Sequence, residues 1–214
     1  MASELVHRAL SFAQKIFQND YSGHDYFHTE RVFKTATHIA LQENANLEIV
    51  QLAALLHDVD DIKLSPQTHA NKENARKFLT ENGVNSPTIE QICEIIGEIS
   101  FAGKNSVTPK TLEGKCVQDA DRLDAIGAIG VARAFAYGGS RNRLMHDPTV
   151  PPKGEMSKEE YHKHESTTIN HFYEKLFKLT DLMNTETAKT IATQRQSYMK
   201  EFVAEFLDEW EGLK

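Results

Sequence analysis

A histidine and an aspartate stand side by side at the end of an apolar run. The pair His57-Asp58 directly follows Leu52-Ala53-Ala54-Leu55-Leu56. An imidazole and a carboxylate at the edge of a buried helix cost free energy unless a partner satisfies them. A divalent metal satisfies both groups, because imidazole nitrogens and carboxylate oxygens are ordinary ligands of such ions. The pair therefore predicts a metal site, provided that other segments supply the remaining ligands.

Two further stretches supply candidate ligands. His28 lies in the stretch Gly23-His24-Asp25-Tyr26-Phe27-His28-Thr29-Glu30-Arg31-Val32. Three acids, Asp119, Asp121 and Asp124, stand close together within residues 118–124. At about 100° per residue, Asp121 and Asp124 share a helix face while Asp119 points away from Asp121. Either Asp121 or Asp124 is therefore a candidate fourth ligand, with the other orienting it.

Helices must position these residues, because helical apolar spacing runs through almost the whole chain. We expect helices over 3–18, 26–42, 46–57, 70–82, 86–99, 113–136, 157–179 and 185–210. Gly83 is typical of a helix end, Ser86-Pro87 is typical of a cap followed by proline, and Ser157-Lys158-Glu159-Glu160 matches a capping box. No segment shows the alternation of a strand. The sequence therefore predicts an all-α fold, a bundle of about eight helices.

Length and charge limit the class of protein. The chain has 214 residues, of which 40% are hydrophobic. This suits one domain over 1–214, with a core over 1–138 that carries the ligands and a C-terminal helical pair over 157–214 packed on it. The formal net charge of -7 argues against a nucleic-acid polymer or an acidic membrane as partner.

Cysteine usage and the first residues bear on the compartment. Cys93 and Cys116 lie in apolar surroundings and are predicted to be buried free thiols. The first residues lack the basic flank and apolar core of a signal peptide. No stretch approaches the roughly 20 apolar residues of a membrane span. We therefore expect a cytoplasmic protein.

The order His, His-Asp, Asp on successive helices resembles the HD-domain superfamily of metal-dependent phosphohydrolases. His28, His57-Asp58 and the aspartate of Ala120-Asp121-Arg122-Leu123 match its four-part signature. Finer strings are similar to the bacterial YpgQ/YedJ-type branch: Gly23-His24-Asp25, Asp119 to Gly127, Ala136-Tyr137-Gly138-Gly139, and His171-Phe172-Tyr173-Glu174-Lys175-Leu176. The resemblance covers nearly the whole chain.

The resemblance implies that His28, His57, Asp58 and Asp121 hold one divalent ion. By family practice this ion is Mn or Mg in activity, with Fe, Co, Ni or Zn as alternatives. Two-metal HD enzymes use additional histidines between the His-Asp pair and the last aspartate. Only His69 lies in that interval here, which favours a single ion.

The resemblance also implies catalytic and substrate-binding residues. Asp61 occupies the position of the catalytic acid of HD-type nucleotidases, where it orients or deprotonates the attacking water. Lys63 matches a lysine that neutralises phosphate charge. An exposed loop pair is the alternative for these two residues. Arg122, beside a ligand, is a candidate for binding phosphate. Arg31, one helical turn after His28, either binds phosphate or fixes the geometry of His28.

Three more residues are candidates for contact with substrate. His24 either contacts substrate or caps the helix that follows it. Arg141 lies in the long loop over 139–156, where it either clamps a phosphate or is solvated. Lys175 shares a helix face with His171, which indicates a pocket wall.

Together these expectations describe a metal-dependent phosphohydrolase that acts on a small phosphorylated substrate, a nucleotide. The narrower expectation is nucleoside triphosphate pyrophosphohydrolase activity on ribo- or deoxyribonucleotides, giving monophosphate and pyrophosphate. One alternative is a 5′-nucleotidase or another phosphomonoesterase. A second alternative, from a different class, is a regulatory HD domain that binds a ligand without turnover. A homodimer is an open possibility by resemblance.

Overall fold

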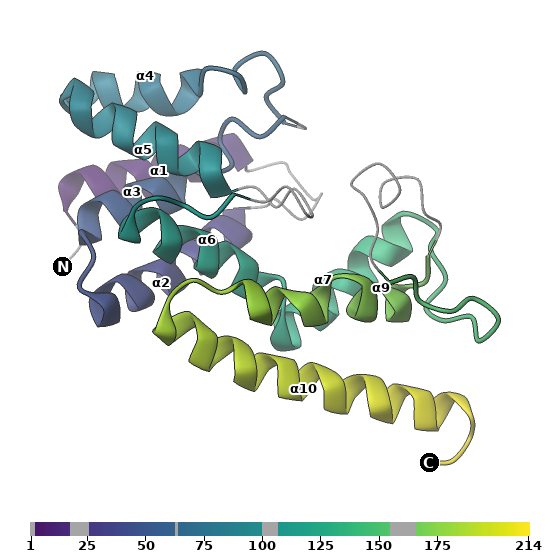
Figure 1. The fold of residues 1–214 in the computed structure, drawn as a ribbon. Helices are drawn as coiled ribbons and strands as arrows, with labels where there is room; N and C mark the ends of the chain where they lie inside the picture. Colours follow the sequence, from purple (N-terminus) through teal and green to yellow (C-terminus); the bar gives the residue numbers. More distant parts are fainter. Residues whose placement is uncertain (1–2, 18–25, 63, 100–106, 155–165) are drawn as a thin grey trace. The chain divides into compact units, whose positions relative to one another are not determined.

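The computed structural model describes residues 3–17, 26–62, 64–99, 107–154 and 166–214. Contacts divide the chain into two compact units, Met1–Asp121 and Arg122–Lys214, which we call unit 1 and unit 2. All regular structure in the described ranges is helical, which confirms the predicted all-α class (Figure 1). The single-domain organisation and the homodimer stay predictions.

Unit 1 is built around a mostly apolar helix that is buried over its last seven residues. Its helices are α1 (Glu4–Phe17), α2 (Tyr26–Glu43), α3 (Leu47–Leu56), α4 (Glu73–Glu81), α5 (Ser86–Ile99) and the greater part of α6 (Leu112–Asp124). Every residue of α3 from Val50 to Leu56 is buried, and α1, α2 and α5 all pack against this helix. A helix buried all round belongs to the core. The His57-Asp58 pair therefore follows directly from the most enclosed helix of the unit.

Side-chain caps fix where these helices begin and end. The Asn46 side chain accepts a hydrogen bond from the Ile49 amide and starts α3. Gly83, at φ +74°, lies just beyond α4 as predicted. The predicted cap at Ser86 is wrong by one residue, because Asn85 Oδ1 accepts the Thr88 amide at 3.0 Å. Asparagine is among the strongest N-cap residues, so it takes this role here.

The long helix predicted over 113–136 is two helices, α6 and α7 (Gly127–Ser140). Ile126 between them is extended, and Gly127 has φ +77°. A Cβ at Gly127 would lie 2.9 Å from Cγ of Arg195, so a close approach also favours glycine. Arg195 donates to the Leu123 carbonyl. The Leu123 carbonyl, which also accepts the Ile126 amide at 3.2 Å, thus gains a second donor where the helix breaks.

The helix predicted over 157–179 also differs from the structure. Residues 155–165, including the expected capping box, lie outside the described residues. Beyond them, α9 (Thr168–Glu174) is followed by the 3₁₀ helix η2 (Leu176–Leu182). Lys175 separates the two with φ -136°, which is not helical.

The core of unit 2 is aromatic. The long helix α10 (Glu186–Trp210) packs against α7 and η2. Phe135 of α7 has its ring within 6.4 Å of those of Phe172, Phe202 and Phe206, measured between centroids. Offset and tilted aromatic pairs of this kind add to the free energy of area burial.

Two further expectations are tested by the described residues. Cys93 and Cys116 are buried and free, as predicted. Burial raises the pKa of the Cys116 thiol to about 12, so this thiol stays protonated. None of the described helices is both long and apolar enough to span a membrane.

Candidate metal centre

The end of α3 fixes the orientation of one imidazole. His57 is the residue that follows the last turn of α3, and its side chain is 3% exposed. Its Nδ1 lies 2.8 Å from the carbonyl oxygen of Ala54. A carbonyl only accepts, so Nδ1 carries the proton and donates it. Nε2 of the neutral ring then presents a lone pair, which is the arrangement that metal-binding histidines require.

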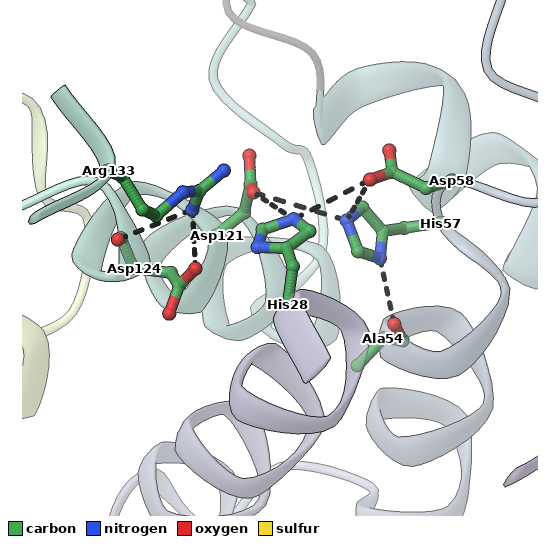
Figure 2. Close-up of polar contacts among 7 residues, drawn as sticks. All are labelled: His28, Ala54, His57, Asp58, Asp121, Asp124 and Arg133. Carbon is green, nitrogen blue, oxygen red and sulfur yellow. Dashed lines mark hydrogen bonds and ion pairs between the residues drawn. The ribbon is translucent and has the colours of Figure 1, made fainter. Parts of the chain in front are cut away.

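Four side chains converge on the point that His57 Nε2 faces (Figure 2). His57 Nε2 lies 3.2 Å from Asp58 Oδ2 and 4.0 Å from Asp121 Oδ1. His28, the third residue of α2, places its Nε2 3.5 Å from Asp58 Oδ2 and 3.4 Å from Asp121 Oδ1. The structure therefore brings together the four residues that the sequence singled out, all within unit 1.

These donors fit a divalent ion. His28, His57 and Asp58 each offer a ligand atom, and these atoms lie within 4.8 Å of one another. Asp121 Oδ1 adds a fourth, within 4.0 Å of both imidazole nitrogens. His57 Nε2 is buried, and it has no hydrogen-bond partner among the residues that the structure describes. A buried lone pair aimed at two carboxylates is satisfied by a cation, and two nitrogens with two oxygens suit a transition metal.

The charges of the cluster shift its protonation equilibria. Burial disfavours the imidazolium of His57, but the carboxylates of Asp58 and Asp121 outweigh it and raise the pKa of His57. Burial likewise favours the neutral Asp121 carboxyl, but a hydrogen bond from His28 and the charges of both histidines lower its pKa. The field at the cluster thus favours positive charge at its centre, supplied by a proton or by a metal ion.

The structure separates the two aspartates that the sequence left as alternatives. Asp121 approaches the two histidines, whereas the Asp124 carboxylate accepts a hydrogen bond from Arg133 of α7 (Figure 2). Arg133 also donates to the Asp124 backbone carbonyl at 3.4 Å. Asp119 is fully buried. Asp121 is thus the carboxylate of this helix that lies at the cluster, and Asp124 pairs with an arginine.

The loop after the His-Asp pair holds the candidate catalytic acid. Asp61 is half-buried, and its amide donates to the Asp58 carbonyl at 3.0 Å, which closes a turn directly after the candidate ligands. Lys63 lies outside the described residues. His69, the one histidine in the interval, places Nδ1 2.8 Å from the Asp60 carbonyl. This nitrogen therefore contacts the backbone of the loop.

Asp60 is a residue whose role sequence reasoning missed. It is 1% exposed, and its two carboxylate oxygens accept the amides of Asn74 and Ala75 at 3.1 and 3.0 Å. These amides belong to the first turn of α4, whose own N-cap residue Lys72 makes no side-chain cap. Asp60 therefore caps α4 from fourteen positions earlier in the chain. Asp60 stands between two other acids, Asp58 and Asp61, so the sequence carries no signal that sets it apart.

The remaining predicted residues fall in different places. Arg31 is half-buried on α2, one turn after His28. Arg122 is buried and donates to the Leu182 carbonyl. Lys175 is half-buried directly after α9, and Arg141 is exposed at the end of α7. His24 lies outside the described residues. A role in binding phosphate stays a prediction for each of them.

Comparison with known sequences finds one family model and a full-length relative. The model described as HD domain matches residues 25–126, which include all four converging side chains. The uncharacterized protein YpgQ of Bacillus subtilis is 36% identical over 205 residues, which span 95% of this chain and 92% of YpgQ.

Several solved structures share the fold over nearly the whole chain. A crystal structure of a Lactobacillus plantarum protein has a TM-score of 0.84 at 40% identity, covering 99% of this chain and 100% of the other. An HD-superfamily hydrolase from Bacillus thuringiensis has a TM-score of 0.78 at 42% identity, covering 96% of each chain. YpgQ crystallised in complex with ADP has a TM-score of 0.77 at 32% identity, covering 98% of this chain and 100% of YpgQ.

Proposed function

The chain belongs to the HD-domain family of metal-dependent hydrolases, and from that premise we propose that it hydrolyses nucleoside triphosphates to monophosphate and pyrophosphate. The observation that carries the proposal is the convergence of His28, His57, Asp58 and Asp121, with the His57 lone pair turned inward. A divalent ion at such a centre attracts anionic oxygens, and a phosphate chain carries several of them.

We propose Mn or Mg as the working ion, with Fe, Co, Ni or Zn as alternatives, held by these four side chains. When bound, such an ion polarises a phosphoryl oxygen and lowers the pKa of a coordinated water. The protein holds the four ligand side chains in fixed positions. The Ala54 carbonyl fixes the proton of His57 on Nδ1, and the buried end of α3 holds the ring in place.

Asp61 is the proposed general base. Asp61 is half-buried and lies one turn after the candidate ligand Asp58, so the chain supplies a further carboxylate close in sequence to the ligands. A carboxylate that is not a ligand can accept the proton of the attacking water or orient that water. Arg31, one turn after His28 on α2, is the proposed phosphate contact of unit 1, since an arginine fork matches two phosphate oxygens.

Support for a nucleotide comes from a relative. YpgQ, which matches nearly the full length of this chain, has been crystallised in complex with ADP. ADP carries the nucleoside and phosphate groups that the proposed substrate also carries. We therefore propose that the substrate of this chain is also a nucleoside phosphate.

The test is a product analysis with purified protein and Mn. Ribo- and deoxyribonucleoside triphosphates, nucleoside monophosphates and cyclic nucleotides are incubated separately, and the products are resolved by anion-exchange chromatography. We expect monophosphate and pyrophosphate in equal amounts from triphosphates. Free phosphate released from monophosphates would instead establish the phosphomonoesterase alternative. No hydrolysis with any divalent metal would overturn the proposal.

Two variants separate metal binding from chemistry. His57→Ala is expected to lose both bound metal and turnover. Asp61→Asn keeps the size of the side chain and is expected to retain the metal while turnover falls by about two to four orders of magnitude, the usual contribution of a general base. Unchanged turnover in Asp61→Asn would remove Asp61 from the mechanism and leave the metal centre intact.

A further inference from the structure

The loop that follows α3 carries both a candidate ligand and the proposed base. Asp58 stands at its start, and the Asp61 amide donates to the Asp58 carbonyl at 3.0 Å. On the other side, the Asp61 carbonyl accepts the amides of Leu64 and Ser65 at 3.1 and 2.7 Å. Backbone hydrogen bonds therefore enclose Asp61 within two successive turns.

Asn74, the second residue of α4, contacts this loop through its side chain and its backbone. Its carboxamide nitrogen donates to the Val59 carbonyl and to the Thr68 hydroxyl, each at 3.1 Å. Its backbone amide donates to Asp60 Oδ1, also at 3.1 Å. The side chain thus uses both of its N–H groups, and Asn74 contacts both residues that directly precede Asp61.

The segment just before α4 holds the same loop at two further points. His69 Nδ1 lies 2.8 Å from the Asp60 carbonyl, which only accepts, so this nitrogen donates the hydrogen bond. The Thr68 hydroxyl, which accepts the Asn74 carboxamide, donates to the Ser65 carbonyl at 3.2 Å. The loop is therefore bonded to the start of α4 on both sides of Asp61.

A neutral donor suits this position because the loop contains three acids, Asp58, Asp60 and Asp61. A lysine or an arginine in place of Asn74 would pair with one of their carboxylates and occupy a group that is needed as a ligand, a cap or a base. A carboxamide donates twice and carries no charge. Asn74 can therefore hold the backbone of the loop while leaving the carboxylates to their own roles.

We propose that Asn74 is a positioning residue for Asp61: its carboxamide fixes the Val59 carbonyl, and with it the loop that aims the Asp61 carboxylate at the attacking water. The inference rests on the proposed role of Asp61 as general base, and it adds a residue of α4 that acts through the loop backbone. A base must lie within hydrogen-bond reach of the proton that it accepts, and a displacement of about 1 Å can lower a rate by about a hundredfold.

The test is a double-mutant cycle of Asn74→Ala and Asp61→Asn, assayed with triphosphate and saturating Mn. Asn74→Ala keeps the backbone amide that Asp60 accepts, so it removes the carboxamide contacts alone. We expect its kcat to fall about ten- to hundredfold, with KM and bound Mn unchanged, because the base is displaced while the metal centre is not. In the Asp61→Asn background the same substitution should change kcat less than about twofold, since no base remains to be positioned.

Hydrogen exchange provides a second readout that needs neither metal nor substrate. In chelator-treated protein, exchange at the amides of Asp61 and Ser65 should accelerate about tenfold in Asn74→Ala, because the loop has lost a contact that holds it. Asn71→Ala removes an exposed carboxamide three residues earlier and is the matched control. This control should retain wild-type kcat and wild-type exchange.

Several results would overturn the positioning role: wild-type kcat and exchange in Asn74→Ala, an equal fall of kcat in both backgrounds, a loss of bound Mn, or equal effects in Asn71→Ala. Two other results would overturn the proposed function instead, namely no hydrolysis by the wild type or unchanged kcat in Asp61→Asn. In either of these cases the exchange measurement still decides whether Asn74 holds the loop.

Discussion

Asp60 and Asp61 are adjacent acids for which we predict opposite consequences of the same substitution. Asp60 is buried and accepts the amides of Asn74 and Ala75, whereas Asp61 is half-buried and is the proposed base. Asp60→Asn preserves shape but leaves one acceptor oxygen for two amides. We therefore expect Asp60→Asn to destabilise the protein more than Asp61→Asn does, and Asp61→Asn to impair turnover.

The magnitude follows from the two hydrogen bonds. A hydrogen bond to a charged group contributes about 1.5–3 kcal/mol, and an amide left buried without a partner costs about 1–3 kcal/mol. Asp60→Asn loses one such bond, so we expect the free energy of unfolding to fall by about 2 kcal/mol. Asp60→Ala loses both, and a fall of about 4 kcal/mol follows.

Urea unfolding followed by circular dichroism measures these differences, and hydrogen exchange locates them. Exchange at the amides of Asn74 and Ala75 should accelerate in Asp60→Asn, whereas exchange in α10 should change only by the global loss of stability. Wild-type stability and exchange in Asp60→Asn would refute the assignment of Asp60 as the cap of α4. A comparable loss of stability in Asp61→Asn would refute the contrast between the two acids.

Three further predictions concern the metal centre and pH. Asp121→Asn should lose bound Mn, as measured by elemental analysis. Asp124→Asn should keep the metal, but its free energy of unfolding should fall by about 1–3 kcal/mol because the ion pair with Arg133 is lost. Equal metal loss in both variants would contradict the separation of the two aspartates. Burial opposes the imidazolium of His57, but the adjacent carboxylates raise its pKa above 6.5. Protons therefore compete with Mn as the pH falls through and below that raised value, and a Mn affinity that does not change between about pH 5 and 8 would contradict this. The pKa of His171 is about 3 in the folded chain and ordinarily 6.5. The neutral His171 therefore contributes fully to the free energy of unfolding above pH 6.5, and this contribution falls by up to about 1.4 kcal/mol per pH unit towards pH 3. Urea unfolding of His171→Gln should show a smaller dependence of the free energy of unfolding on pH.

The helices and the ligand cluster were predictable for the same physical reason. Apolar periodicity marks helices, and the His57-Asp58 pair stands out because polar groups at the end of the apolar helix α3 require a partner. The boundary at Ile126 was not predictable. Residues 113–136 have helical spacing throughout, and the break depends on Gly127 meeting Arg195, which lies far along the chain.

The roles of other acids also depend on distant partners. The choice between Asp121 and Asp124 could not be made from a helical wheel, since Arg133 on the next helix decides it. The capping role of Asp60 required the start of α4 to be placed first. Local sequence determines which residues are polar within an apolar stretch, and tertiary contacts determine what each of them does.

The hydrogen bond from His57 to the Ala54 carbonyl has a consequence for how metal and fold depend on each other. The ring is oriented by the last turn of α3, and that turn is held by apolar burial. The conformational entropy of ordering this ligand is therefore lost during folding, before any ion arrives. Unlike a zinc finger, which acquires its structure only with its ion, unit 1 should keep α3 intact in a chelator. Ion exchange at the centre can then proceed without unfolding, so the metal found in the protein reflects the ions available to it.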